Sequence, residues 1–170
     1  MAASPRPGAR FSLAPSLVLG ALATLLAGGC GALDPGTGPL QAACSDTDSD
    51  PDDTVSFANQ IRPLMNRSST DPTGHGCITC HYSTQPTHPC TDVTGLDLST
   101  LGALRQGGTI TGTSIVIPGK PCESALVQKL QGDYFEGLQM PKDGPPYWSQ
   151  DEIQLVIDWI AEGANGEDSE

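Results

Sequence analysis

The sequence predicts an all-α fold in one domain, and three observations lead to this prediction. Apolar residues recur at helical spacing in two segments, near residues 57–64 and 149–163. Only residues 115–117, Ile-Val-Ile, are typical of a strand, and three residues do not make a sheet. The chain has 170 residues, of which 20 are Gly and 15 are Pro, so we expect one small domain with long loops.

The N-terminus has the layout of a signal peptide, which we expect over residues 1–29. Arg6 and Arg10 precede an apolar stretch of about sixteen residues, shorter than the roughly twenty that a membrane span needs. Residues 26–30, Leu-Ala-Gly-Gly-Cys, resemble a bacterial lipoprotein box, in which Cys30 would receive a diacylglyceryl group. Cleavage without lipidation stays open. In both interpretations the mature chain lies outside the cytoplasm, and lipidation would anchor it to a membrane in the cell envelope, facing the periplasm or the surface.

Two acidic segments flank the expected domain. Residues 30–53 are predicted to form a flexible linker because they contain almost no large apolar side chains and repel one another by charge. Their aspartates at 46, 48 and 50 match the first ligand positions of a calcium loop, but Pro51 and Phe57 replace the Gly and Glu that such a loop needs. Residues 167–170 form an acidic tail. The formal net charge of −12 argues against electrostatic binding to nucleic acid.

Residues 54–166 are expected to contain four helical segments. These are a first helix with Phe57, Ile61 and Leu64 on one face, a piece over 99–106 ended by Gly107, a piece over 122–130 opened by Pro121, and a last helix over 149–163. Pro63 must kink or end the first helix because it lacks an N–H. The last helix has the strongest pattern, since Ser149 and Glu152 form a capping box ahead of an apolar stripe.

The most specific motif consists of Cys77, Cys80 and His81. Two thiols at this spacing can form thioethers with the two vinyl groups of one haem while the next residue's imidazole binds the iron. Three other uses of the cysteines were weighed. A dithiol oxidoreductase needs a strand before the first cysteine, and a zinc site needs a second close pair of Cys or His. A plain disulfide would give His81 no role. Covalent haem attachment is the favoured interpretation.

On these residues the chain resembles a mono-haem cytochrome c, and more narrowly the planctomycete-type cytochrome c-like domain of secreted bacterial proteins. The resemblance spans about residues 55–164 and is carried by Phe57, Ile61, Pro63, Cys77, Cys80, His81, residues 95–98 (Gly-Leu-Asp-Leu), 107–108 (Gly-Gly), 117–119 (Ile-Pro-Gly), Ser124, Leu126, Met140, Pro141, Glu152, Ile153, Trp159, Ile160, Gly163 and Ala164. It implies a cytochrome c-like fold of about four short helices with Gly/Pro-rich loops around one covalently bound haem c.

The resemblance also implies that His81 and Met140 are the two axial ligands. Independently, a thioether is a soft ligand that raises the reduction potential, and Met140 lies in a stiff Pro-rich loop that could hold its sulfur against iron. Met65, His75 and His88 are the rivals for the sixth position. Packing of Met140 in the core is the ordinary alternative.

Two further sets of residues are assigned from the sequence. The candidates to line the haem are Phe57, Ile61, Leu138, Ile157, Trp159 and Ile160, each with ordinary helix packing as the alternative. In an oxidising compartment we expect a disulfide, with Cys90 and Cys122 as the first choice because Cys44 falls in the expected linker. Cys44 would then be free or bonded to another molecule.

Together these features predict an exported, membrane-tethered c-type cytochrome that carries single electrons to redox partner proteins and is not an enzyme. A second possibility is a haem-based sensing or binding module whose sixth position is weakly bound or open. A third is a non-haem, disulfide-stabilised surface lipoprotein. Retention of haem after denaturation would separate the third from the other two.

Overall fold

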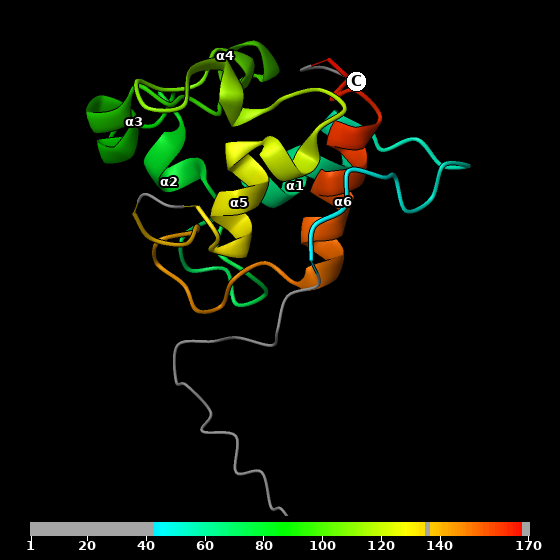
Figure 1. Cartoon of the computed structure of the whole chain (residues 1–170). Helices are drawn as coiled ribbons and strands as arrows, with labels where there is room; N and C mark the ends of the chain where they lie inside the picture. The colour runs from blue at the N-terminus through cyan, green and yellow to red at the C-terminus, as the bar shows by residue number, and fades with distance from the viewer. Residues whose placement is uncertain (1–42, 135–136, 168–170) are drawn as a thin grey trace, which may run out of the picture. The chain divides into compact units, whose positions relative to one another are not determined.

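The computed structural model describes residues 43–134 and 137–167, all within one compact unit (Figure 1). The expected signal peptide, Cys30 and most of the acidic tail lie outside these residues. Where the structure is described the chain is helical and contains no strand, in agreement with the predicted all-α class. None of the described helices is long and apolar enough to cross a membrane.

The described residues form six α-helices, one π-helical turn and two 3-10 turns, joined by loops. In chain order they are η1 (Phe57–Ile61, π), α1 (Arg62–Met65), α2 (Ile78–His81), α3 (Pro89–Thr94), α4 (Leu101–Gln106), η2 (Gly112–Ile115, 3-10), η3 (Pro121–Glu123, 3-10), α5 (Ala125–Gln131) and α6 (Gln150–Ala161). The sequence patterns missed α2, α3 and η2, which are short. Val116, in the segment that looked strand-like, has an extended backbone and follows η2.

The first predicted helix is present, and Pro63 changes its geometry without ending it. The π-helical turn η1 comes directly before α1, which has Pro63 near its start. Pro63 cannot donate a hydrogen bond, and at the beginning of α1 none is needed from it. Phe57 and Ile61 are fully buried, and the Phe57 ring lies 5.1 Å from the Trp159 ring, centroid to centroid.

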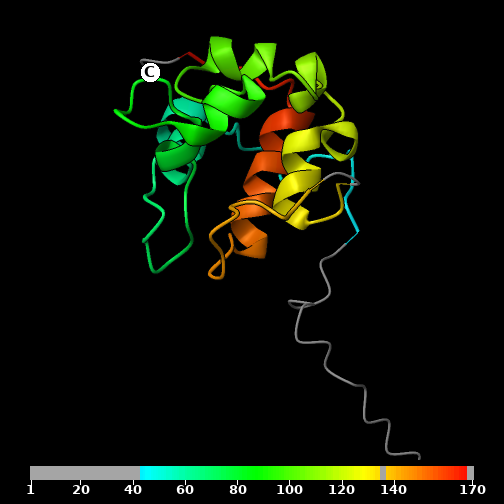
Figure 2. The same cartoon turned by 90° about the vertical axis from the view of Figure 1, so that its left-hand side faces the viewer.

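The last predicted helix is confirmed in full as α6. The Ser149 hydroxyl accepts a hydrogen bond from the backbone N–H of Glu152 at 3.2 Å, and the Glu152 carboxylate accepts one from the Ser149 N–H at 2.8 Å. This capping box satisfies N–H groups that an open helix end leaves without partners. The apolar stripe packs against η1, η3 and α5, and α5 runs alongside α6 in both views (Figures 1 and 2).

The two middle helices differ from their predicted bounds because of two hydroxyl side chains. Thr100 caps α4 by accepting from the Ala103 N–H at 3.0 Å, so α4 begins later than residue 99. It ends, as predicted, at Gly107, whose φ is 70° and where a Cβ would come within 1.8 Å of the Gly112 carbonyl oxygen. Ser124 is extended and buried, and it divides the predicted 122–130 piece into η3 and α5.

Residues 43–53 are attached to the domain, which corrects the expectation of a flexible linker for this part of 30–53. The Ser49 N–H and hydroxyl donate to the two carboxylate oxygens of Asp158 at 2.8 and 2.7 Å. Asp46 accepts from the backbone N–H of Cys122 at 2.9 Å. Hydrogen bonds to specific partners on the domain outweigh the mutual repulsion of the aspartates.

The predicted Cys90–Cys122 disulfide is wrong. Cys122 is bonded to Cys44, with an S–S distance of 2.08 Å, and Cys90 is a free thiol. The prediction failed because it placed Cys44 in a detached linker. The contact between Asp46 and Cys122 instead brings Cys44 beside η3.

Candidate functional site

An apolar cavity brings together the four residues predicted to bind haem. Cys77, Cys80, His81 and Met140 all line it, and it has a volume of about 170 Å³ and is partly open to solvent. Its apolar wall comes from Leu96, Leu98, Ile110, Ile115, Leu126, Leu130 and Tyr134. This volume is below the range of about 300 to 1,000 Å³ for cofactor and ligand sites, and the cavity is open on one side.

One helical turn positions the two motif cysteines and the histidine. The backbone N–H groups of Cys80 and His81 both donate to the Cys77 carbonyl oxygen, at 3.2 and 2.9 Å. The Cys77 N–H donates to the Met65 carbonyl oxygen at 2.8 Å, which fixes the turn to the end of α1. Gly76 allows this approach, since a Cβ there would come within 2.1 Å of the Arg67 carbonyl oxygen.

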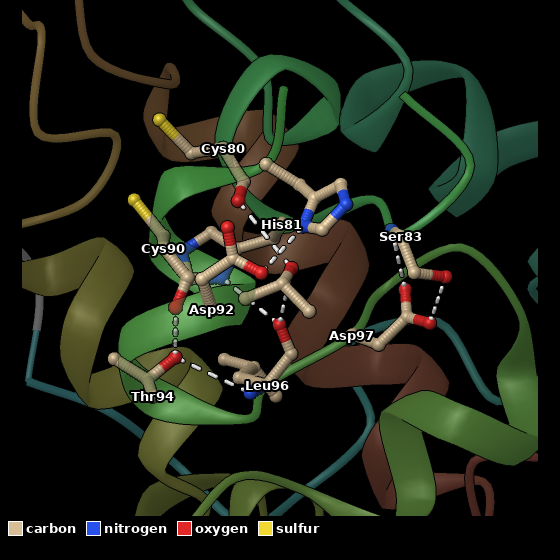
Figure 3. Close-up of polar contacts among 10 residues, drawn as sticks. Cys80, His81, Ser83, Cys90, Asp92, Thr94, Leu96 and Asp97 are labelled. Carbon is tan, nitrogen blue, oxygen red and sulfur yellow. Dashed lines mark hydrogen bonds and ion pairs between the residues drawn. The ribbon is translucent and has the colours of Figure 1, made fainter. Parts of the chain in front are cut away.

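His81 is buried and has a defined orientation. Its Nδ1 lies 3.3 Å from the Leu96 carbonyl oxygen (Figure 3). Because a carbonyl can only accept, Nδ1 must carry the proton, and Nε2 keeps the lone pair that binds metals. Burial lowers the pKa of His81, although the Leu96 hydrogen bond and the charge of Asp97 oppose this shift. The imidazole is therefore held in the neutral form that a metal ligand requires.

The pKa of Cys77 argues against a dithiol oxidoreductase. Burial, with a smaller effect of Cys80, raises the pKa of Cys77 to about 12. Reactive cysteines of oxidoreductases instead have lowered pKa values that favour the thiolate. A thiol that stays protonated is a poor nucleophile.

Metal binding by side chains alone has no support in the described part of the chain. No group of three or more His, Cys, Asp or Glu side chains within it is placed to hold a metal ion. The structural zinc alternative needs four such ligands. The calcium alternative for residues 46–50 fails for the same reason.

Met140 is far in sequence from Cys77, Cys80 and His81 but lines the same cavity. Its N–H donates to the Lys129 carbonyl oxygen at 2.8 Å, which ties its loop to α5. Its rivals for the sixth position do not line the cavity: Met65 is 1% exposed in the core, and His75 and His88 lie in other loops. Of the four candidates for the sixth position, only Met140 lines the cavity.

The expected haem-lining residues do not line the cavity. Phe57, Ile61, Ile157, Trp159 and Ile160 pack in the hydrophobic core, and Leu138 is 63% exposed. Their alternative interpretation, ordinary packing, is the correct one for the first five. The residues that do line the cavity had a weak signal: Leu126 and Leu130 are spaced as one face of a helix, and Leu96 and Leu98 alternate around Asp97. Cys90, another lining residue, was missed because it was assigned to a disulfide.

No family model, curated protein or solved structure matches this chain.

Proposed function

We propose that the chain is a c-type cytochrome that carries single electrons through one covalently bound haem. The observation that supports this most directly is the convergence of Cys77, Cys80, His81 and Met140 on one apolar cavity. The first three belong to one helical turn, and Met140 comes from a distant loop. Residue chemistry and the family resemblance assign the same four residues to haem.

The cavity has properties that a haem would require. Its wall is mostly apolar, which suits the porphyrin face, and its opening to solvent would leave one edge of a large planar group exposed. Lys129 and Lys142 also line it and could neutralise the two propionates. When bound, haem supplies reversible one-electron chemistry at its iron.

The chain's own residues would each have a distinct role. Cys77 and Cys80 would provide the thioether bonds, and His81 would offer Nε2 in an orientation set by the Leu96 carbonyl. Met140 would offer its thioether sulfur, which favours ferrous iron and a higher potential. Because His81 and Met140 would both bind the iron and leave no position for a substrate, we propose electron transfer and no enzymatic activity.

The location of the protein in the cell is part of the proposal. A signal peptide over residues 1–29 and lipidation at Cys30 would place the domain outside the cytoplasm and at a membrane. Because residues 44–53 are fixed to the domain by the Cys44–Cys122 disulfide and by Ser49, the span between lipid and domain would be limited to residues 31–43. Redox proteins that reach this membrane surface are the proposed partners.

The decisive experiment is export of the full chain in a bacterial host that attaches haem covalently. We expect a red protein whose denatured mass includes one haem and whose pyridine haemochrome spectrum is that of haem c. The C77A/C80A double variant is the matched control and should be colourless after denaturation. A colourless wild-type protein with no added mass would refute the proposal and favour the non-haem lipoprotein. A high-spin spectrum with carbon monoxide binding would favour the sensing module.

A further inference from the structure

Cys90 lies beside Cys80 in the wall of the cavity. It belongs to the first turn of α3, and its sulfur points to the same side as the sulfur of Cys80 (Figure 3). Burial, and next to it a hydrogen bond with the Cys80 thiol, raises the pKa of Cys90 to about 11. Both side chains line the cavity.

The backbone around the two thiols is held in place by threonine side chains. The Thr91 hydroxyl lies 3.4 Å from the Cys80 carbonyl oxygen and 3.1 Å from that of Leu96, so α3 is fastened to the end of α2. The Thr94 hydroxyl donates to the Cys90 carbonyl oxygen at 2.6 Å. The proximity of the thiols therefore follows from the packing of two helices and does not depend on a loop.

The cavity is lined by an odd number of free thiols. Cys44 and Cys122 are bonded to each other, so the free thiols of the described residues are Cys77, Cys80 and Cys90. Haem attachment uses two thiols. In an oxidising compartment, neighbouring free thiols are oxidised to disulfides unless something prevents it.

We propose that Cys90 is the redox partner of Cys80, and that in the haem-free exported chain these two residues form a disulfide which must be reduced before haem can be attached. The second half of this proposal rests on the proposed haem attachment, and the first half rests only on the proposed export. The bond would occupy the Cys80 sulfur that the thioether needs, while Cys77 would remain a thiol. Cys90 would thereby control the order of events at the site.

The chemistry is ordinary thiol–disulfide exchange. In the forward direction, Cys80 and Cys90 transfer two electrons and two protons to an oxidised disulfide of a partner oxidoreductase, which becomes a dithiol. In the reverse direction, a reduced dithiol attacks the Cys80–Cys90 bond, a mixed disulfide forms, and the second thiol of the reductant resolves it. The products are free Cys80 and Cys90 thiols and an oxidised reductant.

The disulfide can be tested directly in the exported chain from a host without a haem-attachment system. Free thiols are alkylated without prior reduction, and the protein is cleaved after Tyr82, which separates Cys77 and Cys80 from Cys90. We expect the two peptides to be joined, with their summed mass less two hydrogen atoms and plus one alkyl group on Cys77. The link should persist in C77A, disappear in C80A and C90S, and remain in V93A, an exposed position on the same helix. Separate peptides would overturn the proposal, whether the three thiols are all alkylated or Cys77 is bonded to Cys80.

The consequence for haem attachment is tested in a competent host with and without its dithiol reductant. Wild-type and V93A chains should lose most of their covalent haem when the reductant is absent, and C90S should lose less. Equal loss in C90S and wild type would overturn the control by Cys90. A chain that forms the Cys80–Cys90 link but never takes up haem would refute the proposed function and leave the thiol pairing standing. A chain that takes up haem but never forms the Cys80–Cys90 link would support the proposed function and refute the thiol pairing.

Discussion

The indole Nε1 of Trp148 donates a 2.7 Å hydrogen bond to the carbonyl oxygen of His75. The His75 N–H in turn donates to the Pro146 carbonyl oxygen at 3.2 Å. One of the two joined loops follows Met140 and the other leads into Cys77. Since Trp148 is only 4% exposed, the pair is shielded from water. This contact therefore ties the segment that follows Met140 to the segment that leads into Cys77.

Replacing Trp148 by Phe removes the indole N–H and leaves the His75 carbonyl without that partner. An unsatisfied buried acceptor costs about 1–3 kcal/mol, so the free energy of unfolding should fall by that amount in a denaturant titration. In the haem-loaded protein the Met140 loop should also be less firmly held. The near-infrared band of thioether-bound ferric haem should weaken, whereas the Y147F variant should keep it. An unchanged band in W148F would show that the loop is held by other contacts.

Replacing Met140 by Ala should lower the reduction potential and open the iron to carbon monoxide. The loss of a soft thioether should shift the potential by on the order of 100 mV, within the range of about 0.8 V that axial ligands cover. Met65 provides the matched control because it is buried in the core and does not line the cavity. M65L should keep the wild-type potential and spectrum. If M140A keeps the wild-type spectrum and does not bind carbon monoxide, Met140 is not a ligand of the iron.

Replacing both Cys44 and Cys122 by Ser should destabilise the domain. The disulfide joins residues 78 positions apart, and a loop of this length is expected to contribute about 4 kcal/mol by restricting the unfolded chain. The double variant avoids a free Cys122 that could pair wrongly. Denaturant unfolding without reductant measures the loss, and V93A, which changes an exposed side chain and keeps every cysteine, is the control. Equal stability of the double variant and wild type would show that this bond does not hold the segment in place.

Features that depend on neighbouring residues could be predicted from the sequence. The capping box of Ser149 and Glu152 fixes the start of α6, and Gly107 fixes the end of α4, because both act over a few residues. Cys77, Cys80 and His81 are likewise local, since a single turn brings them together. Met140 could be assigned to the site only with the help of a family resemblance and ligand chemistry.

Features that depend on distant contacts could not be predicted. The pairing of Cys44 with Cys122 follows from hydrogen bonds between residues more than seventy positions apart, such as Asp46 to Cys122. No spacing rule encodes them. The haem-lining prediction failed for a related reason: an apolar stripe such as that of α6 shows that a face is buried but not what covers it. The Trp159 ring contacts the Phe57 ring in the core, and α5 supplies part of the cavity wall instead.

The haem-free chain should lose stability as the pH falls from about 7 to 5, because of His81. Burial lowers the pKa of His81 in the folded state below its ordinary value of 6.5. As the pH falls through 6.5, the unfolded chain binds a proton at this residue and the folded chain does not, so protonation favours unfolding. Above that pH both states are neutral and the effect disappears. The free energy of unfolding should therefore rise with pH across this window.

Denaturant titrations of haem-free protein between pH 5 and 8 measure this slope. The window lies above the range in which most carboxylates titrate, so they contribute little to it. H81Q has a neutral side chain at every pH and should flatten the slope, whereas H88Q should retain it because His88 does not line the cavity. A slope that survives in H81Q would mean that His81 is not the group that protonates on unfolding. Because a neutral, buried His81 with its proton on Nδ1 is also the form that can bind iron, the same measurement tests the ligand's readiness before haem arrives.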